Sequence, residues 1–184
     1  MNTTGILIDS FKRVISTTPI DKATVGQIAR EAGVSRQAFY DRFTDKYDAS
    51  IQIFEQSFGP VAEGHRNRET TWLESGVQHL SIYAADKDYY RNVLSSYDRS
   101  SLRFYLNKRM YNEFYHKCAL RGARFKSDDE LYALKMVVFA TNEMTFEWIE
   151  QGCREPAEVI VKRFDLCRPL ILSPYLEDKD SNLV

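Results

Sequence analysis

Apolar residues recur at steps of three and four along most of the chain, the spacing that places them on one face of an α-helix. Nine segments have this spacing: 4–17, 24–32, 36–43, 45–58, 69–85, 87–96, 100–124, 128–151 and 156–172. The alternating pattern of a half-buried strand is scarce, and only five prolines and eight glycines interrupt the chain. We therefore expect an all-α fold of about nine helices.

Three of the expected helix starts carry capping residues. Thr24 is followed three positions later by Gln27, and Ser127 by Glu130, which is the spacing of a capping box. Pro156 suits the first position of the last helix, where its missing N–H costs nothing. These signals place three boundaries independently of the apolar pattern.

Gly59-Pro60 is the strongest interruption between the expected helices. Proline removes a helical hydrogen bond and clashes with the preceding turn, so we expect the fourth helix to end there. The chain is expected to divide into an N-terminal unit over 1–50, a second helical unit over 51–175 and a polar tail over 176–184.

The charge balance limits the kinds of partner. With 25 basic and 26 acidic residues the net charge is −1, so any contact with nucleic acid must be local rather than a broad positive surface. The longest apolar run, 136–140, is far shorter than the roughly 20 residues of a membrane span. Three cysteines without paired spacing, Cys118, Cys153 and Cys167, suit a reducing compartment. We expect a cytoplasmic protein with no membrane segment.

The segment 24–43 has the pattern of two short helices joined by a tight turn. Gly33 lies between them, and its missing Cβ permits the positive φ that such a turn needs. Ala29 is small enough for the helices to approach closely, and Ser35 can cap the second helix. Four apolar side chains supply a buried face: Ile28, Val34, Phe39 and Phe43.

The outward side of the second short helix carries an unusual set of side chains: Arg36, Gln37, Ala38, Tyr40 and Arg42. A helix-turn-helix places its second helix in the major groove of DNA, where Arg can pair with guanine, Gln with adenine and a methyl group with thymine. The same geometry also occurs as a plain packing motif. Packing accounts for the glycine and the apolar positions but not for the polar set.

These positions belong to a longer pattern, Ile28-Ala29-x3-Gly33-Val34-Ser35-x3-Phe39-Tyr40-x2-Phe43-x2-Lys46. It resembles the DNA-binding module of the TetR family of bacterial transcription regulators, in detail over residues 4–50. The resemblance implies a helix-turn-helix domain, a C-terminal helical effector and dimerisation domain, and a homodimer on double-stranded DNA with a palindromic operator. It implies that four residues contact the DNA backbone: Thr24, Ser35, Tyr40 and Lys46. The candidate base readers are then Arg36, Gln37, Ala38 and Arg42.

Several features depart from the family pattern. Arg42 stands where histidine is commoner, and Ala38 where threonine is commoner. Residues 1–50 carry seven basic and six acidic residues, and none of the basic ones precedes Lys12. We therefore expect weak non-specific affinity and a specific complex that depends on the dimer.

The two long C-terminal segments each carry an apolar stripe at helical steps. The stripes comprise Leu134, Val138, Thr141, Thr145 and Trp148, followed by Phe164, Cys167 and Ile171. Both segments also have apolar residues away from these stripes, so each needs two partners. We expect the stripes to form a four-helix dimer interface. The alternative is that they belong to the core of one protomer.

Aromatic residues gather in the middle of the chain, where the resemblance implies a small-molecule pocket. Its candidate lining residues are Trp72, Tyr83, Tyr105, Tyr111 and Tyr115. The alternative is that these aromatics are ordinary core. Charge is segregated nearby, with eight basic residues and one acidic residue over 99–126 and eight acidic and two basic residues over 127–158. Adjacent helices can neutralise these charges, or the basic segment can bind an anionic ligand or an acidic partner protein.

A weaker resemblance, carried by Trp148-Ile149, Gly152 and Pro156, is to regulators of dihydroxyacetone kinase operons. The chain has no phosphate-binding loop, nucleophile elbow or metal-ligand spacing, so we predict no enzymatic activity, cofactor or metal. The leading prediction is a sequence-specific transcription regulator controlled by a small molecule or partner protein that the C-terminal domain senses. The alternative, implied by the weaker resemblance, is an interaction adaptor whose signal is a partner protein.

Overall fold

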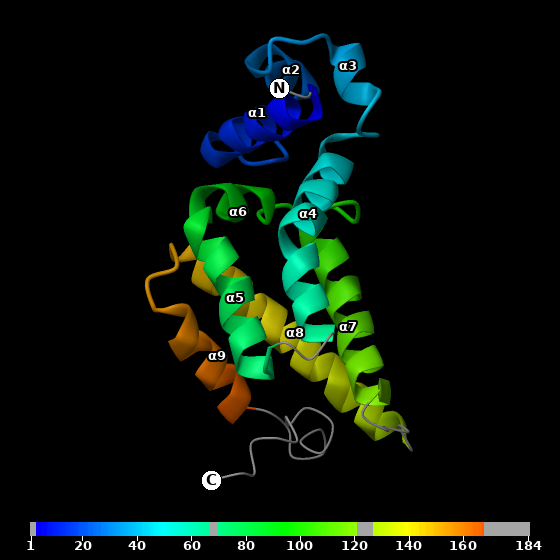
Figure 1. Cartoon of the computed structure of the whole chain (residues 1–184), viewed down its shortest axis with the longest axis vertical. Coiled ribbons are helices and arrows are strands. Elements are labelled where there is room, and N and C mark those ends of the chain that lie inside the picture. Colours follow the sequence, from blue (N-terminus) through cyan, green and yellow to red (C-terminus); the bar gives the residue numbers. More distant parts are fainter. Residues whose placement is uncertain (1–2, 67–69, 121–126, 168–184) are drawn as a thin grey trace.

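The computed structural model describes residues 3–66, 70–120 and 127–167 of the chain. These residues form nine α-helices and no strand, which confirms the predicted all-α fold (Figure 1). The helices are α1 (Thr3–Thr17), α2 (Val25–Glu31), α3 (Arg36–Tyr40), α4 (Lys46–Arg66), α5 (Trp72–Ala85), α6 (Lys87–Val93), α7 (Leu102–Leu120), α8 (Asp128–Glu150) and α9 (Ala157–Leu166). None of these nine has the length and apolar character needed to cross a membrane.

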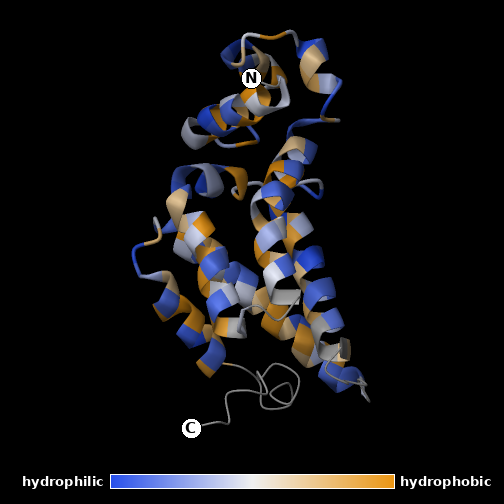
Figure 2. Ribbon diagram, viewed as in Figure 1, coloured by the Kyte–Doolittle hydropathy of each residue, from blue (hydrophilic) through white to orange (hydrophobic). Residues whose placement is uncertain are grey.

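The helices form two groups that share one long helix (Figure 1). Helices α1, α2 and α3 pack together at one end of the molecule, and α4 leads from them into the second group. There α5 packs against α4 and α9, α7 packs against α4 and α8, and α6 contacts α1 of the first group. Apolar and polar residues interleave along the helices, as expected of amphipathic helices that cover a core (Figure 2).

Helix α4 does not end at Gly59-Pro60 as predicted but continues from Lys46 to Arg66. A proline in a helix interior costs about 3 kcal/mol or more. Phe58 and Ala62, on either side of Pro60, are both buried in the core, while Pro60 itself is exposed. We attribute the unbroken helix to this burial. The expected boundary between residues 50 and 51 also falls inside α4.

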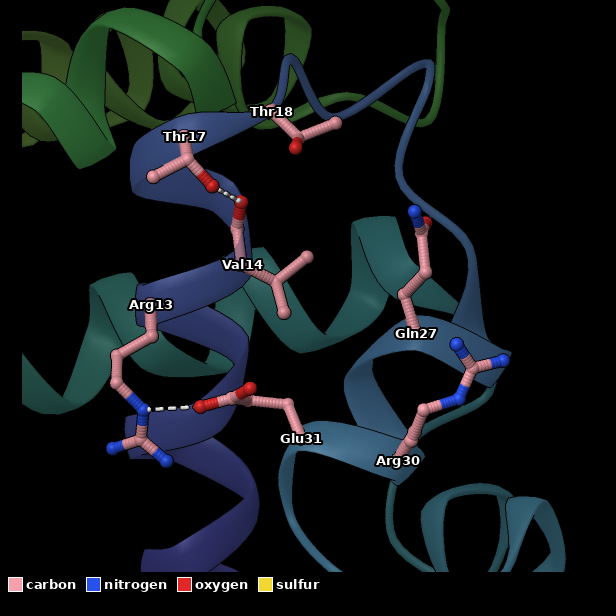
Figure 3. A pocket seen from close by; sticks show the side chains of 7 residues that line it. All are labelled: Arg13, Val14, Thr17, Thr18, Gln27, Arg30 and Glu31. Carbon is pink, nitrogen blue, oxygen red and sulfur yellow. Dashed lines mark hydrogen bonds and ion pairs between the residues drawn. The ribbon is translucent and has the colours of Figure 1, made fainter.

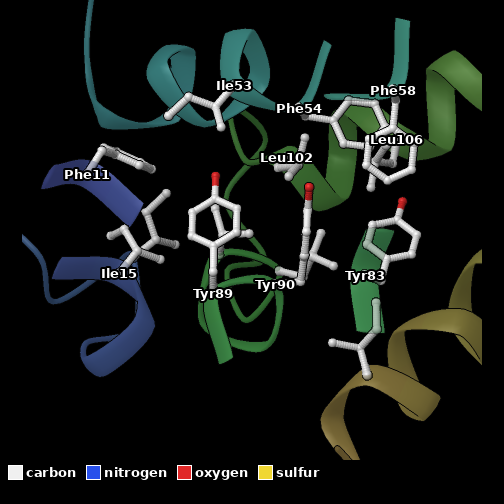
Figure 4. Close-up of a cluster of buried hydrophobic side chains, with 14 of the residues drawn as sticks. Phe11, Ile15, Ile53, Phe54, Phe58, Tyr83, Tyr89, Tyr90, Leu102 and Leu106 are labelled. Carbon is white, nitrogen blue, oxygen red and sulfur yellow. The ribbon is translucent and has the colours of Figure 1, made fainter. Parts of the chain in front are cut away.

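One hydrophobic core runs through both groups of helices. Its centre is a set of packed rings that we call the aromatic core (Figure 4): Phe11, Phe54, Phe58, Tyr83, Tyr89 and Tyr90. The centroid of the Phe58 ring lies 4.1 Å from that of Phe54, 4.9 Å from that of Tyr83 and 6.2 Å from that of Tyr90. Because its members come from α1, α4, α5 and α6, the aromatic core holds the two groups together.

Helix α6 is also hydrogen-bonded to the end of α1. The Asn92 amide donates to the carbonyls of Ile15 and Ser16 at 2.8 and 3.1 Å, and the Ile20 N–H donates to the Asn92 carbonyl at 3.2 Å. The last carbonyls of a helix have no partners inside it, so Asn92 satisfies groups that α1 cannot satisfy itself. Polar bonds thus reinforce the apolar junction between the two groups.

Candidate nucleic-acid interface and ligand cavity

Helices α2 and α3 form the predicted helix-turn-helix. Gly33 has a φ of 67°, and the turn is closed by the Val34 N–H, which donates to the Ala29 carbonyl at 3.0 Å. Ala29 and Phe39 are buried where the two helices meet. The expected roles of Gly33 and of this apolar face are therefore confirmed, and they fix the direction of α3.

Both short helices begin at the predicted capping residues. The Thr24 hydroxyl accepts from the Gln27 N–H at 3.2 Å, and the Gln27 side chain accepts from the Thr24 N–H at 2.8 Å, which completes a capping box. The Ser35 hydroxyl accepts from the Ala38 N–H at 3.1 Å. Ser127 likewise accepts from the Glu130 N–H at the start of α8. The first two caps orient the helix-turn-helix whether or not their hydroxyls also contact DNA.

The polar set on and just after α3 faces solvent. Its exposed members are Arg36, Gln37, Tyr40 and Arg42, and Ala38 is half-buried. The Gln37 amide donates to the Asp41 carboxylate at 2.8 Å, so the two side chains share one face of the helix. Asp41 was not predicted as a functional residue, although its spacing of four from Gln37 indicated this contact. A carboxylate here repels phosphate and can accept from cytosine N4.

Lys46, the first residue of α4, ties that helix to the loop before α2. Its ammonium donates to the carbonyls of Asp21 and Ala23 at 3.0 and 3.1 Å. An ammonium has three N–H donors, so one remains for a further acceptor such as phosphate. Next to it the Tyr47 hydroxyl donates to the Asp21 carboxylate at 2.8 Å. Partial burial, followed by this hydrogen bond, raises the pKa of Tyr47.

Helices α2 and α3 and the start of α4 enclose a surface hollow of about 510 Å³, which we call the α2–α4 hollow. It brings together four of the eight predicted DNA contacts: Thr24, Arg36, Tyr40 and Lys46. Gly26 and Tyr47 also line it and were not predicted, because only the folded structure places them beside these residues. The hollow is a local basic and aromatic site on a protein with no net positive charge.

A second hollow, of about 430 Å³, lies between α1 and α2 (Figure 3). Arg13 and Arg30 both line it, together with Glu31. The Arg13 guanidinium pairs with the Glu31 carboxylate at 2.8 Å. Arginine charge at this site is therefore partly neutralised within the protein.

The second group of helices encloses a cavity of about 90 Å³. Its walls come from α4, α5, α7, α8 and α9 and are mainly apolar, with Phe54, Leu80 and Phe146 among the lining residues. Its polar lining residues include Arg109, Glu113 and Asn142. An enclosed, mostly apolar site with a few polar groups is typical of a small-molecule pocket.

Of the five predicted pocket aromatics, the structure places Tyr83 in the cavity wall. The Tyr105 hydroxyl instead donates to the Glu55 carboxylate at 2.9 Å, Tyr111 packs beside Phe114, and Tyr115 is exposed. These three do not line the cavity. Helical spacing alone did not show which face of α7 lines the cavity. The Trp72 side chain lies outside the described residues.

Two basic residues of α7, Arg103 and Arg109, pair with carboxylates of adjacent helices. The Arg109 guanidinium pairs with Glu55 of α4 at 2.6 Å and with Glu113 at 3.1 Å. Arg103 pairs with two carboxylates of α8, Glu143 and Glu150. For these two arginines the structure supports neutralisation between helices. Positions 121–126 of the basic segment lie outside the described residues.

The apolar stripe expected to form the dimer interface lies largely inside the protomer. Leu134, Val138, Thr145 and Trp148 are buried, Thr141 and Phe164 are half-buried, and Cys167 is exposed. Ile171 lies outside the described residues. A side chain with little accessible surface has little to lose on association, so the four buried residues pack the protomer's own core, as in the alternative interpretation. The exposed large apolar side chains of α8 are different ones: Tyr132, Met136, Phe139 and Met144.

Two family descriptions match the chain. Residues 7–48 match "Bacterial regulatory proteins, tetR family", and residues 70–166 match "Transcriptional regulator C-terminal region". No curated protein matches the chain. The first match covers the helix-turn-helix and Lys46, and the second covers the helices that form most of the cavity wall.

Three solved structures have similar folds. A dihydroxyacetone kinase operon activator, DhaS, has a TM-score of 0.63 and 18% identity, covering 94% of this chain and 96% of that one. The fatty acid degradation regulator FadR from Bacillus halodurans has a TM-score of 0.61 and 22% identity, with coverage of 90% and 94%. FadR from Bacillus subtilis, in complex with stearoyl-CoA, has a TM-score of 0.58 and 20% identity, with coverage of 92% and 96%. At these identities the likeness establishes the fold alone.

Proposed function

Because the chain belongs to the TetR family of bacterial transcription regulators, we propose that it binds a palindromic operator as a homodimer and that its second group of helices senses the signal. The observation that carries this proposal is the polar surface of α3, held outward by a capped and tightly turned helix-turn-helix. The protein acts by binding rather than by catalysis, in the cytoplasm, where its DNA lies.

On DNA, α3 enters the major groove and its outermost side chains face the base edges. Gln37, Ala38 and Arg42 are the proposed base readers. Gln suits adenine, Arg suits guanine and the alanine methyl suits thymine. Thr24, Ser35, Tyr40 and Lys46 contact the phosphate backbone and set the register of α3. Arg36 belongs to neither set, because it lines the α2–α4 hollow.

The test of DNA binding is a selection of duplexes from a random library by the full-length protein. A selected sequence with two-fold symmetry supports a dimer on a palindrome, because each protomer reads one half-site. Selection that enriches no sequence at low ionic strength contradicts the proposal.

Replacing Gln37 by alanine is expected to weaken binding to the selected duplex by about 1–3 kcal/mol, because one base-edge contact is lost. Binding to an unrelated duplex should hardly change. Fluorescence anisotropy with both duplexes measures the difference. As the matched comparison, Lys46→Ala should weaken both complexes by the same factor, because a phosphate contact carries no sequence information. Equal losses on both duplexes in Gln37→Ala would show that Gln37 reads no base.

We propose that the two protomers meet through the exposed side of α8. Tyr132, Met136 and Phe139 follow one another at helical steps on that side, and each is at least half exposed. Soluble monomers rarely expose a contiguous apolar patch of this kind unless it binds something. The interface would thus lie on the side of α8 opposite the stripe that packs the core.

Replacing Phe139 by glutamate is expected to convert the dimer into monomers, because the interface would have to bury an unpaired carboxylate. Sedimentation velocity gives the mass, and operator affinity should fall in parallel. Phe104 on α7 is equally exposed, at 52% against 50% for Phe139, so Phe104→Glu is the control and should remain dimeric. Monomers from the control but not from Phe139→Glu would place the interface elsewhere.

The signal enters through the cavity as a small effector. At about 90 Å³ the cavity is well below the roughly 300–1,000 Å³ of drug-sized ligand pockets, so a large ligand requires it to open. The same small size favours the second candidate, an adaptor whose signal is a partner protein at the surface. Native mass spectrometry distinguishes the two, because a small molecule retained by the purified protein supports the cavity and a co-purifying protein supports the adaptor.

A further inference from the structure

We propose that Gly26 is a positioning residue for Arg36, and that it directs the Arg36 guanidinium toward a DNA phosphate rather than a base edge. The inference rests on the proposed DNA-binding function and refines it. It assigns a role to a glycine with no side chain of its own and removes Arg36 from the set of base readers.

The guanidinium of Arg36 lies directly against the backbone of Gly26. A Cβ atom built on Gly26 would be 2.7 Å from Nη2, 3.0 Å from Nε and 3.1 Å from Cζ of Arg36. The 2.7 Å separation from Nη2 is one that real Cβ atoms essentially never show and the other two are unusually tight, so with any other residue at position 26 the guanidinium would have to move. Arg36, at the start of α3, is therefore folded back over α2.

The helical period separates Arg36 from the base readers. Arg36 and Tyr40 are four residues apart and share one face of α3, and both line the α2–α4 hollow. Gln37 shares a different face with Asp41, to which it is hydrogen-bonded. The guanidinium thus belongs to the hollow, whereas Gln37 belongs to the outer surface of the helix.

The groups around the hollow suit a phosphate. Arg36 presents a guanidinium, Tyr40 a phenol and Lys46 its remaining N–H donor, and arginine binds phosphate with two parallel hydrogen bonds. One carboxylate, that of Asp45, also lines the hollow, but it accepts the N–H groups of Tyr47 and Asp48 at 2.7 and 2.9 Å. The net charge of Arg36, Lys46 and Asp45 is one positive charge, which a negatively charged phosphate would compensate.

The substitution Gly26→Ala tests this arrangement without threatening the fold. The atoms that the new methyl group would meet are the end of a flexible side chain, so the guanidinium moves and the backbone does not. Alanine is also the better helix former, and Gly26 is inside α2. A thermal unfolding curve no lower than that of the wild type would verify that only Arg36 has been displaced.

The experiment uses the full-length protein, a duplex that it selects from random DNA and an unrelated duplex of the same length, over a series of salt concentrations. Arg36→Ala is expected to weaken both complexes by the same factor, on the order of tenfold, and to lower the logarithmic salt slope by about 0.9 for each protomer. Gly26→Ala should reproduce both effects. The double variant should bind no more weakly than Arg36→Ala alone, because both changes remove the same contact.

Arg30→Ala is the matched control, since it removes an arginine of the same helix-turn-helix from the other hollow (Figure 3). It should cost much less affinity than Arg36→Ala; an equal loss would attribute the effect to net charge and overturn the assignment. A loss confined to the selected duplex in Arg36→Ala, or unchanged binding in Gly26→Ala, would also overturn it. If the wild type binds both duplexes equally, sequence-specific regulation fails, but the unrelated duplex still measures the phosphate contact. A protein that binds neither duplex overturns both proposals.

Discussion

Replacing Phe58 by alanine is expected to lower the free energy of unfolding by about 3–5 kcal/mol, the range for removing a large ring from a packed core. Phe58 is fully buried and contacts rings from two other helices, α5 and α6. Because the aromatic core joins the two groups of helices, the cavity left behind would weaken their connection as well as each group. Urea unfolding followed by circular dichroism measures the change.

The control for this prediction is Phe104→Ala. Phe104 is 52% exposed on α7, so its removal leaves no cavity and should cost less than about 1 kcal/mol. A loss for Phe58→Ala no larger than that for the control would mean that the core collapses around the gap. Operator affinity of the folded Phe58→Ala protein reports separately on the connection between the groups.

Raising the pH above 10 is expected to unfold the protein steeply. Burial is the main cause that raises the pKa values of Tyr83, Tyr89 and Tyr90, and neighbouring acidic or phenolic groups raise them further, while Arg109 opposes the effect at Tyr83. In the unfolded chain these phenols titrate near 10. Their contribution to stability is therefore complete below pH 10 and is lost as the pH rises toward the folded-state values.

Each of these tyrosines contributes a slope of up to about 1.4 kcal/mol per pH unit above pH 10, because the unfolded state loses a proton that the folded state keeps. The measurement is the free energy of unfolding in urea between pH 9 and pH 11. Tyr83→Phe should reduce the slope by up to one such increment, whereas Tyr97→Phe should not, since Tyr97 is 79% exposed. Equal slopes for the wild type and Tyr83→Phe would show that another group controls alkaline unfolding.

The helix-turn-helix could be predicted almost completely because its determinants are local. Gly33 controls the turn through its own φ, and Thr24 and Ser35 cap helices that begin at the next residue. Interactions between residues this close in sequence can be predicted from the sequence alone. The course of α4 through Pro60 could not be predicted in this way, because it depends on burial of Phe58 and Ala62 by distant helices.

The second half of the chain shows the limit of helical spacing. Helix α8 has apolar residues on two faces, and periodicity identifies both without saying which faces inward. Val138 faces the core and Phe139 faces solvent, although they are adjacent. The pocket aromatics have the same ambiguity, and among the members of that set whose side chains the structure describes, only Tyr83 lies in the cavity wall. The contact of Gly26 with Arg36 had no signal in the sequence, since it joins two helices through a missing side chain.

The ion pairs of Arg109 limit any redesign of the cavity to bind a chosen small molecule. This side chain is in the wall, yet its guanidinium also neutralises Glu55 and Glu113. Exchanging it for a neutral residue would leave two carboxylates without their shared cation beside apolar surface, so such library members should be less stable than the parent. A biosensor library should therefore keep the arginine and diversify apolar wall positions such as Leu80 and Met110.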